Sequence, residues 1–242
     1  FLSSAFDFES VDFLYGIGVF AFKIASGEIT NYPLLRHIAK KGKPIIMSTG
    51  MSTIGEIEKA IDTIYSTGNK KLILLHCTSV YPPKTENLNL RTLPFLRKTF
   101  KTLVGFSDHS PSIILPSIAV ALGARVIEKH FTIDRDLPGP DQGLSLEPHE
   151  FKAMIENIRV TEKALGFYGK KLSEEEKEVR EIARRSIVAA IDIPAGTKIT
   201  KNMITFKRPA KGIPPKFADI IEGMIAKKHI EENEVLSWEK LK

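Results

Sequence analysis

The chain has 242 residues, of which 43% are hydrophobic and 26% charged, a composition typical of a soluble protein with one large or two smaller domains. No apolar run approaches the roughly 18 residues that span a bilayer, and no basic segment leads into an apolar export signal, so we expect no membrane association. The formal net charge is +6, but lysines and glutamates are interleaved, which indicates a solvated surface and argues against nucleic-acid binding.

Cys77 is the only cysteine, so no intrachain disulfide can form. A chain without disulfides fits a reducing compartment. We therefore expect a cytoplasmic protein.

The first two thirds of the chain contain short, nearly continuous apolar runs. Such runs are typical of strands buried on both faces of a parallel sheet. The predicted strands are Val19–Ala25, Pro44–Ser48, Leu72–Cys77, Leu103–Ser107 and Arg125–Phe131.

Helical patterns alternate with these runs. Ile54–Tyr65 carries apolar residues at helical spacing, Pro111–Leu122 is a more apolar helix, and Pro148–Leu165 ends the series. Serial alternation of strand and helix predicts a parallel α/β fold, either a barrel or an open sheet.

The composition changes near Gly166. Gly166–Lys177 is rich in Gly, Lys and Glu and is interpreted as a linker with one short helical piece, while Ser186–Ile191 is predicted to be a strand. A weak repeat follows, in which Ile193–Thr200 resembles Ile230–Ser237: an apolar residue, a polar turn, a short strand and a Ser or Thr that could cap a helix. We therefore predict domains at 1–166 and 180–242, joined by a linker at 167–179.

Lys23 lies within an otherwise apolar strand and so requires a counter-charge. A substrate phosphate or carboxylate could supply it, and so could Glu28 or another acid at the sheet edge. A third interpretation is the Schiff-base lysine of an aldolase.

Two histidines follow neighbouring predicted strands. Adjacent strands lie about 4.8 Å apart, so His109 and His130 could share one divalent metal ion and leave positions open for substrate. Two independent histidines at the sheet edge are an equally good interpretation of the residues alone. Glu128 points to the same side of its strand as His130 and could act as ligand or proton relay.

Ser48–Ser52 is small and rich in hydroxyls immediately before a predicted helix. Such a segment could hold an anion at the helix N-terminus.

Several short motifs follow one another in the chain: Phe22–Glu28 with Asn31–Pro33, Ser48–Met51, His76–Pro82, Gly105–Ser110, and Glu128–Thr132 with Pro138–Asp141. The residues and the order of these motifs resemble the sialic acid synthase family over essentially the whole chain. The segment Phe206–Gly212 resembles the antifreeze-like (SAF) domain of that family.

The resemblance implies a (β/α)8 barrel of the TIM type followed by a small β-rich SAF domain. It implies a metal-dependent enzyme that condenses phosphoenolpyruvate with N-acetylmannosamine or a related amino sugar, forming a nine-carbon 2-keto acid and phosphate. The implied cofactor is Mn²⁺ or Mg²⁺, and the implied assembly is a homodimer with swapped C-terminal domains.

The resemblance also implies roles for individual residues. His109 and His130 would bind the metal, and Lys23, Glu28 and Glu128 would be catalytic. The residues implied to bind substrates are Ser26, Ser79, Tyr81, Ser107, Asp141 and Arg208, of which Arg208 would reach the partner subunit's barrel. At Ser79 some members of the family carry Asn.

Relative to the family pattern, Phe1–Asp7 matches the end of the third barrel strand. The first two strands, with acidic and lysine residues of the site, have no counterpart in this sequence. We therefore expect an incomplete barrel that is inactive by itself, and a non-catalytic binding or assembly module stays an alternative to the synthase and the aldolase.

Overall fold

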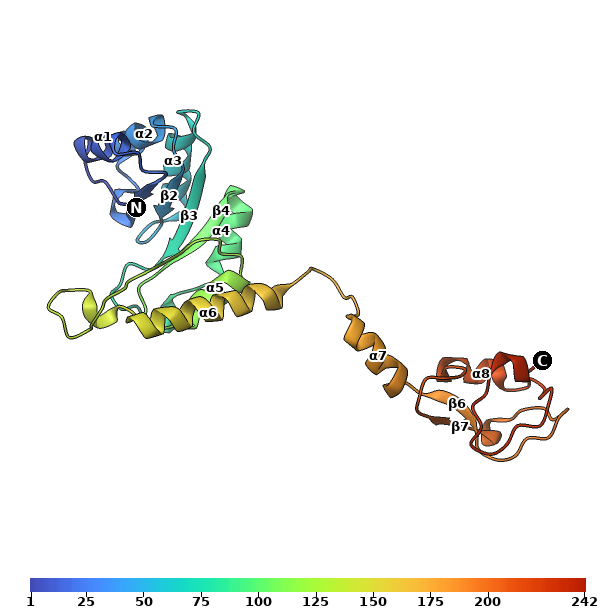
Figure 1. Ribbon diagram of the computed structural model, residues 1–242. Helices are drawn as coiled ribbons and strands as arrows, with labels where there is room; N and C mark the ends of the chain where they lie inside the picture. The colour runs from blue at the N-terminus through green and yellow to red at the C-terminus, as the bar shows by residue number, and fades with distance from the viewer. The chain divides into compact units, whose positions relative to one another are not determined.

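The computed structural model describes all residues, 1–242, and the chain divides into two compact units, Phe1–Phe167 and Tyr168–Lys242 (Figure 1). None of the helices combines the length and the apolar character needed to cross a membrane.

The first unit contains one parallel sheet whose strands lie side by side in chain order. This arrangement confirms the predicted parallel α/β fold. Several strands are shorter than the predicted ones, because a residue belongs to a strand only where it forms backbone hydrogen bonds with a neighbouring strand. The strands are β1 (Phe22–Ile24), β2 (Ile45–Ser48), β3 (Leu72–Cys77), β4 (Leu103–Asp108) and β5 (Ile127–Lys129).

Helices connect the strands (Figure 1). Two of them, α3 (Ile54–Tyr65) and α6 (Pro148–Leu165), have the predicted bounds. The predicted Pro111–Leu122 helix begins later, because the hydroxyl of Ser112 accepts hydrogen bonds from the amides of Ile114 and Leu115 and so ends the preceding loop. The remaining helices are α1 (Phe8–Gly16), α2 (Tyr32–Lys40), α4 (Thr92–Phe100) and α5 (Leu115–Ala121).

The two faces of the sheet differ in chemistry because side chains alternate along each strand. One face packs in the hydrophobic core of the unit, where Phe22, Ile45 and Phe106 are fully buried. The other face carries Lys23 and Ser107, which are also buried. This second face holds the candidate site, because Lys23 and Ser107 line a common cavity.

The sheet is strongly curled. β1 and β5 are its two outer strands, and in a flat sheet they would lie about 19 Å apart at the usual strand spacing. The Nζ atom of Lys23 on β1 is nevertheless 3.4 Å from Oε2 of Glu128 on β5. The sheet is therefore a half-barrel. It continues beyond β1 through a parallel bridge between Ser4 and Lys23, and a closed barrel of eight strands stays a prediction.

The second unit begins with α7 (Glu174–Ala183), followed by β6 (Ser186–Ala189), β7 (Ile204–Lys207) and α8 (Ala218–Ile221). The ten-residue α7 occupies part of the predicted linker, because Ser173 and Glu176 form a capping box that fixes the helix start. β6 and β7 are antiparallel, and the unit has a hydrophobic core of its own.

The predicted repeat forms two interlocked halves. Ile193 and Ile230 exchange both backbone hydrogen bonds, at 2.8 and 2.9 Å, and both side chains are fully buried. Each half then turns through a residue in the left-handed region, Gly196 in one and Asn233 in the other. The Ser and Thr expected to cap helices precede short 3₁₀ turns instead, and their side chains make no capping bond.

Asn69 ties two loops together at the start of β2 and β3. Its side-chain amide donates to the carbonyls of Ala39 and Lys43, at 3.2 and 2.9 Å, and its Oδ1 accepts from the amide of Lys71 at 3.0 Å. Because these groups are largely buried, Asn69→Ala should lower the free energy of unfolding by about 2–3 kcal/mol. Urea denaturation measures this effect. The exposed Asn87, changed to Ala, is the matched control, and an equal loss in both variants would contradict the role given to Asn69.

Candidate active site

A cavity of about 250 Å³ opens at the carboxyl ends of the strands, where catalytic groups stand in α/β folds. It is formed by the polar face of the half-barrel. Seven of the residues predicted from the sequence line it together: Lys23, Ser26, Ser79, Tyr81, Ser107, His109 and Glu128.

Strand register sets one row of this cavity. Cys77, Ser107 and Glu128 are direct partners across β3, β4 and β5, so their side chains point to the same face. The Ser107 hydroxyl donates a hydrogen bond of 2.7 Å to Oε1 of Glu128. This bond orients the carboxylate within the row.

Lys23 makes three contacts with oxygen atoms, and its side chain is only 10% exposed. Its ammonium group donates to Ser48 Oγ at 2.8 Å and to the Ile24 carbonyl at 3.2 Å, and it pairs with Glu128 at 3.4 Å. The counter-charge expected for this lysine is therefore a carboxylate at the sheet edge. It is Glu128 and not Glu28, because the curl brings β5 over β1.

The start of α3, where the sequence suggested an anion site, carries a capping box. α3 begins after Thr53, whose side chain accepts from the amide of Glu56 while the Glu56 carboxylate accepts from the amide of Thr53. A carboxylate of the chain itself thus occupies the helix start, and it would repel another anion. Ser48 lines the cavity instead, and the Gly50 amide donates to Ser26 Oγ.

At Gly50 the backbone lies close to the side chains of Ser26, Cys77 and Ser79. Its amide donates to Ser26 Oγ at 3.0 Å. A Cβ at this position would lie 2.1 Å from Ser79 Oγ and 2.9 Å from Ser26 Oγ. Only glycine therefore allows Ser26 and Ser79 to occupy their present positions.

The two histidines are brought together. Nδ1 of His109 lies 2.9 Å from Nε2 of His130, and the Tyr81 ring packs 4.2 Å from the His109 ring. The other nitrogen of His109 lies 3.3 Å from Cys77 Sγ. These contacts fix the orientation of His109 from three sides. The histidines line a further cavity of about 220 Å³ with Ser107, Asp108, Glu128 and Lys129.

Burial, assisted by the neighbouring His130, lowers the pKa of His109 to about 4. The imidazole is therefore neutral at physiological pH, the form that binds metals. Nδ1 of His109 and Nε2 of His130 are therefore two candidate ligands for a divalent ion, with Glu128 in the adjoining row, whereas Asp141 Oδ2 lies 3.9 Å from the other ring nitrogen of His130, Nδ1.

Three predicted residues line neither cavity: Asp141, which approaches His130, Glu28 and Arg208. Glu28 accepts a hydrogen bond of 2.8 Å from the Asn31 side chain and is not among the residues that line either cavity. Arg208 belongs to the second unit, where it is exposed and forms no ion pair or side-chain hydrogen bond.

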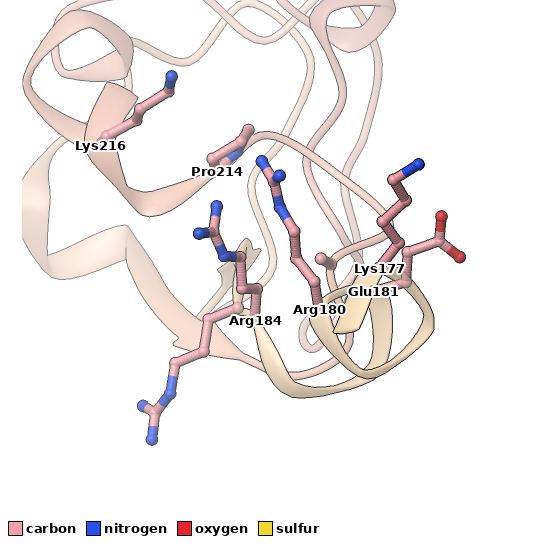
Figure 2. Close-up of a pocket in the computed structure, with 8 residues that line it drawn as sticks. Lys177, Arg180, Glu181, Arg184, Pro214 and Lys216 are labelled. Carbon is pink, nitrogen blue, oxygen red and sulfur yellow. The ribbon is translucent and has the colours of Figure 1, made fainter. Parts of the chain in front are cut away.

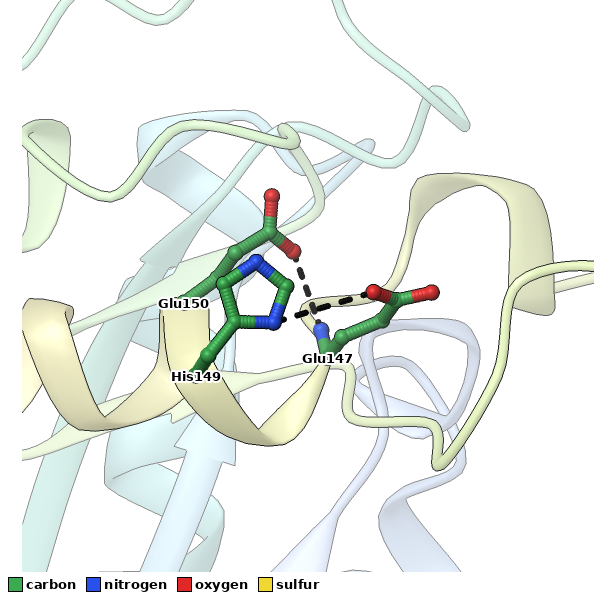
Figure 3. Close-up of side chains that lie close together, drawn as sticks. All are labelled: Glu147, His149 and Glu150. Atoms are coloured by element: carbon green, nitrogen blue, oxygen red, sulfur yellow. Dashed lines mark hydrogen bonds and ion pairs between the residues drawn. The ribbon is translucent and has the colours of Figure 1, made fainter.

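A second group with metal-binding atoms is formed by Glu147, His149 and Glu150 at the start of α6 (Figure 3). Its carboxylates already have partners: Glu150 accepts from the Glu147 amide at 3.0 Å and from Arg135, and Glu147 accepts from the Arg135 amide at 3.2 Å. These are the bonds of a helix cap. The group is accounted for by local structure.

The second unit has a basic cavity of about 440 Å³ between α7 and the loop at 210–216 (Figure 2). Part of its charge is accounted for locally, because Lys177 pairs with Glu174 at 2.7 Å and Lys216 lies over the Phe217 ring. Arg180 and Arg184 have no acidic partner, but both are exposed to solvent. No buried polar side chain points into this cavity.

Sequence reasoning assigned no role to Cys77, Asp108 or Lys129 and considered Ser48 only as part of an anion site at a helix start, although all four lie in or beside the site. Ser48 and Cys77 end predicted strands, and that position was the available signal. Asp108 and Lys129 directly follow Ser107 and Glu128, which were identified. Because side chains alternate along a strand, this position assigned Asp108 and Lys129 to the opposite face of the sheet.

Gly50→Ala should disturb ligand binding with little loss of stability. The added methyl group displaces Ser26 and Ser79, and a shift of about 1 Å can cost about 100-fold in activity. The measurement is kcat/KM together with thermal unfolding. Gly55→Ala is the control, because a Cβ there meets nothing within 4 Å and alanine favours the helix. Similar kinetics for both variants would contradict this assignment.

Stability should depend on pH through His109. The unfolded chain takes up this proton near pH 6.5 and the folded chain only near pH 4, so lowering the pH favours unfolding between these values. Metal-free protein should therefore lose up to about 3 kcal/mol from pH 7.5 to pH 4 through this group. His109→Asn should remove that part of the dependence in denaturation curves, whereas His149→Asn, at an exposed position, should keep it.

Comparison with known proteins places these features in a family. The model of the NeuB family matches residues 1–170 and that of the SAF domain residues 184–242. The N,N'-diacetyllegionaminic acid synthase of Campylobacter jejuni is 46% identical over 98% of this chain and 71% of that protein. Its namesake in Legionella pneumophila is 43% identical over 99% of this chain and 68% of that protein.

A solved structure agrees with these matches. The N-acetylneuraminic acid (sialic acid) synthetase of Leptospira borgpetersenii superposes with a TM-score of 0.69 and 37% identity, covering 73% of this chain and 61% of that chain. The family match extends over both cavities of the site. The chain belongs to the NeuB family and carries a C-terminal SAF domain.

Proposed function

We propose that the protein is a metal-dependent synthase of the sialic acid synthase type. It condenses phosphoenolpyruvate with an N-acetylated amino-sugar aldehyde, N-acetylmannosamine or a related sugar, to a nine-carbon 2-keto sugar acid and phosphate. The observation that carries the proposal is the cavity in which Lys23, Ser26 and Ser107 lie beside the contacting pair His109 and His130. The membership of the NeuB family supports it.

The Lys23 side of the cavity suits the anionic groups of phosphoenolpyruvate. Lys23 supplies a buried positive charge, and Ser26 and Ser48 supply hydroxyls beside it. Hydrogen bonds to charged groups are about twice as strong as neutral ones. An incoming phosphate or carboxylate would share the Lys23 ammonium with Glu128.

The histidine side suits a divalent ion, with Mn²⁺ or Mg²⁺ as the proposed cofactor. His109, which is neutral at physiological pH, and His130 would hold it through ring nitrogens that lie in contact. Such an ion would polarise the aldehyde oxygen of the sugar. The Tyr81 ring packs at a tilt against the His109 ring, with 4.2 Å between the ring centroids, and lines the cavity beside it.

The reaction requires one new C–C bond and one broken C–O bond. The C3 carbon of phosphoenolpyruvate attacks the aldehyde carbon, and C2 acquires cationic character. Water adds at C2, and phosphate leaves with the C2–O bond broken, so that a ketone remains. Glu128, oriented by Ser107 and neutralised by Lys23, is the group that we propose to accept or deliver a proton at this stage.

The remaining predicted residues are assigned to the sugar. Asp141, near His130, and Glu28, on the turn that follows Ser26, would contact its hydroxyls. Arg208 would serve the partner subunit's site in a homodimer with swapped SAF domains. Ser79 lines the cavity beside Gly50.

The reaction itself is the main test. Protein expressed from its full open reading frame should release phosphate and form a nine-carbon 2-keto acid from phosphoenolpyruvate and an N-acetylated amino sugar, with mass spectrometry identifying the product. Chelation should abolish this activity and Mn²⁺ restore it. A folded protein that binds phosphoenolpyruvate but releases no phosphate with any such sugar would favour a binding module.

Lys23→Ala distinguishes charge binding from covalent catalysis. Loss of the charged hydrogen bonds should raise the KM for phosphoenolpyruvate and lower kcat/KM by about 10- to 100-fold. The exposed Lys40, changed to Ala, is the matched control. Activity that survives chelators, together with a borohydride-trapped substrate adduct on Lys23, would contradict the proposal and establish an aldolase.

A further inference from the structure

A buried ion pair lies directly beside the two histidines. Asp108 and Lys129 are register partners on β4 and β5, with Nζ 2.6 Å from Oδ2 and with side chains that are 0% and 1% exposed. Ser107 and Glu128 precede them on the same strands, so the ion pair lies on the opposite face from the candidate cavity row.

Lys129 holds more than its counter-charge. Its ammonium group also donates to the backbone carbonyls of Ser110 and Ser112, the latter at 3.1 Å. Asp108 Oδ1 in turn accepts from the Ser110 amide at 2.9 Å. Lys129 therefore bonds to Asp108 and Ser110, the residues on both sides of His109. Lys129 itself directly precedes His130.

We infer that Asp108 and Lys129 are positioning residues that fix the spacing of His109 and His130. Each histidine follows one member of the pair, so the distance between the imidazoles depends on how the two strand ends are held. A general stabilising role is a poor explanation, because a buried ion pair often contributes no more than well-packed apolar residues. Apolar residues would leave the Ser110 and Ser112 carbonyls without the Lys129 donor.

This inference rests on the proposed function only where metal binding is concerned. Outer partners of metal ligands typically change metal affinity by 10- to 100-fold when they are removed. The imidazole contact itself, 2.9 Å between Nδ1 of His109 and Nε2 of His130, is a property of the metal-free protein. It can be measured whether or not the protein is a synthase.

The test is the double variant Asp108→Asn/Lys129→Met, which leaves no buried charge unpaired. Mn²⁺ affinity, measured by titration with electron paramagnetic resonance, should fall by about 10- to 100-fold. Phosphoenolpyruvate affinity should change by less. In metal-free protein, the ¹⁵N shifts of His109 and His130 should move toward those of free imidazole, because their contact is lost.

A second ion pair of the same unit provides the matched control. Arg135→Met/Glu150→Gln removes the pair between the β5–α6 loop and α6 and should destabilise the unit without changing the histidine shifts or Mn²⁺ affinity. Lys129→Gln keeps a shorter donor and decides the question if the double variant does not fold. Its Mn²⁺ affinity and histidine shifts should also change.

Unchanged histidine shifts in a folded Asp108→Asn/Lys129→Met or Lys129→Gln protein would overturn the inference, as would equal losses in the control. A wild-type protein that binds no Mn²⁺ would overturn the proposed function instead, and the shifts would still decide the role of the ion pair.

Discussion

The candidate site depends on the contact between Lys23 and Glu128, which joins the two outer strands of a five-stranded sheet. Neither residue could meet the other in a flat sheet, because the strands between them would hold them about 19 Å apart. The contact therefore requires the curl. The same curl directs the polar face of all five strands inward, so that hydroxyl groups from three strands and both histidines line adjoining cavities.

The charges of this site are balanced before any ligand arrives. Lys23 is 10% exposed and Glu128 41%, and a buried lysine without a partner would be costly. Glu128 lies nearer to solvent and is oriented by Ser107. In the function proposed above, an anionic ligand would share the Lys23 ammonium with Glu128, which keeps its bond to the Ser107 hydroxyl. The contact between Lys23 and Glu128 is formed before binding, and such prior ordering lowers the free-energy cost of binding.

The sequence was sufficient for features that depend on neighbouring strands, and insufficient for those that depend on curvature. The meeting of His109 and His130 follows from the order of two adjacent strands, so it could be predicted as one of two interpretations. The partner of Lys23 could not be chosen between Glu28 and a more distant acid, because that choice is set by curl over the whole sheet. The closed start of α3 was visible in Thr53 and Glu56, whose spacing is that of a capping box.

The two repeat segments of the second unit, Ile193–Thr200 and Ile230–Ser237, pair with each other through their first residues. Ile193 and Ile230 exchange backbone hydrogen bonds. In addition, the amide of Gly196 donates to the carbonyl of Ala226, and the amide of Asn233 donates to the carbonyl of Ala189. Each half therefore completes its backbone hydrogen bonds only when the other is present. Such an arrangement has high contact order, which slows folding, and it allows no half-folded domain of appreciable stability. A nascent chain must therefore expose both segments, Ile193–Thr200 and Ile230–Ser237, before this domain can form.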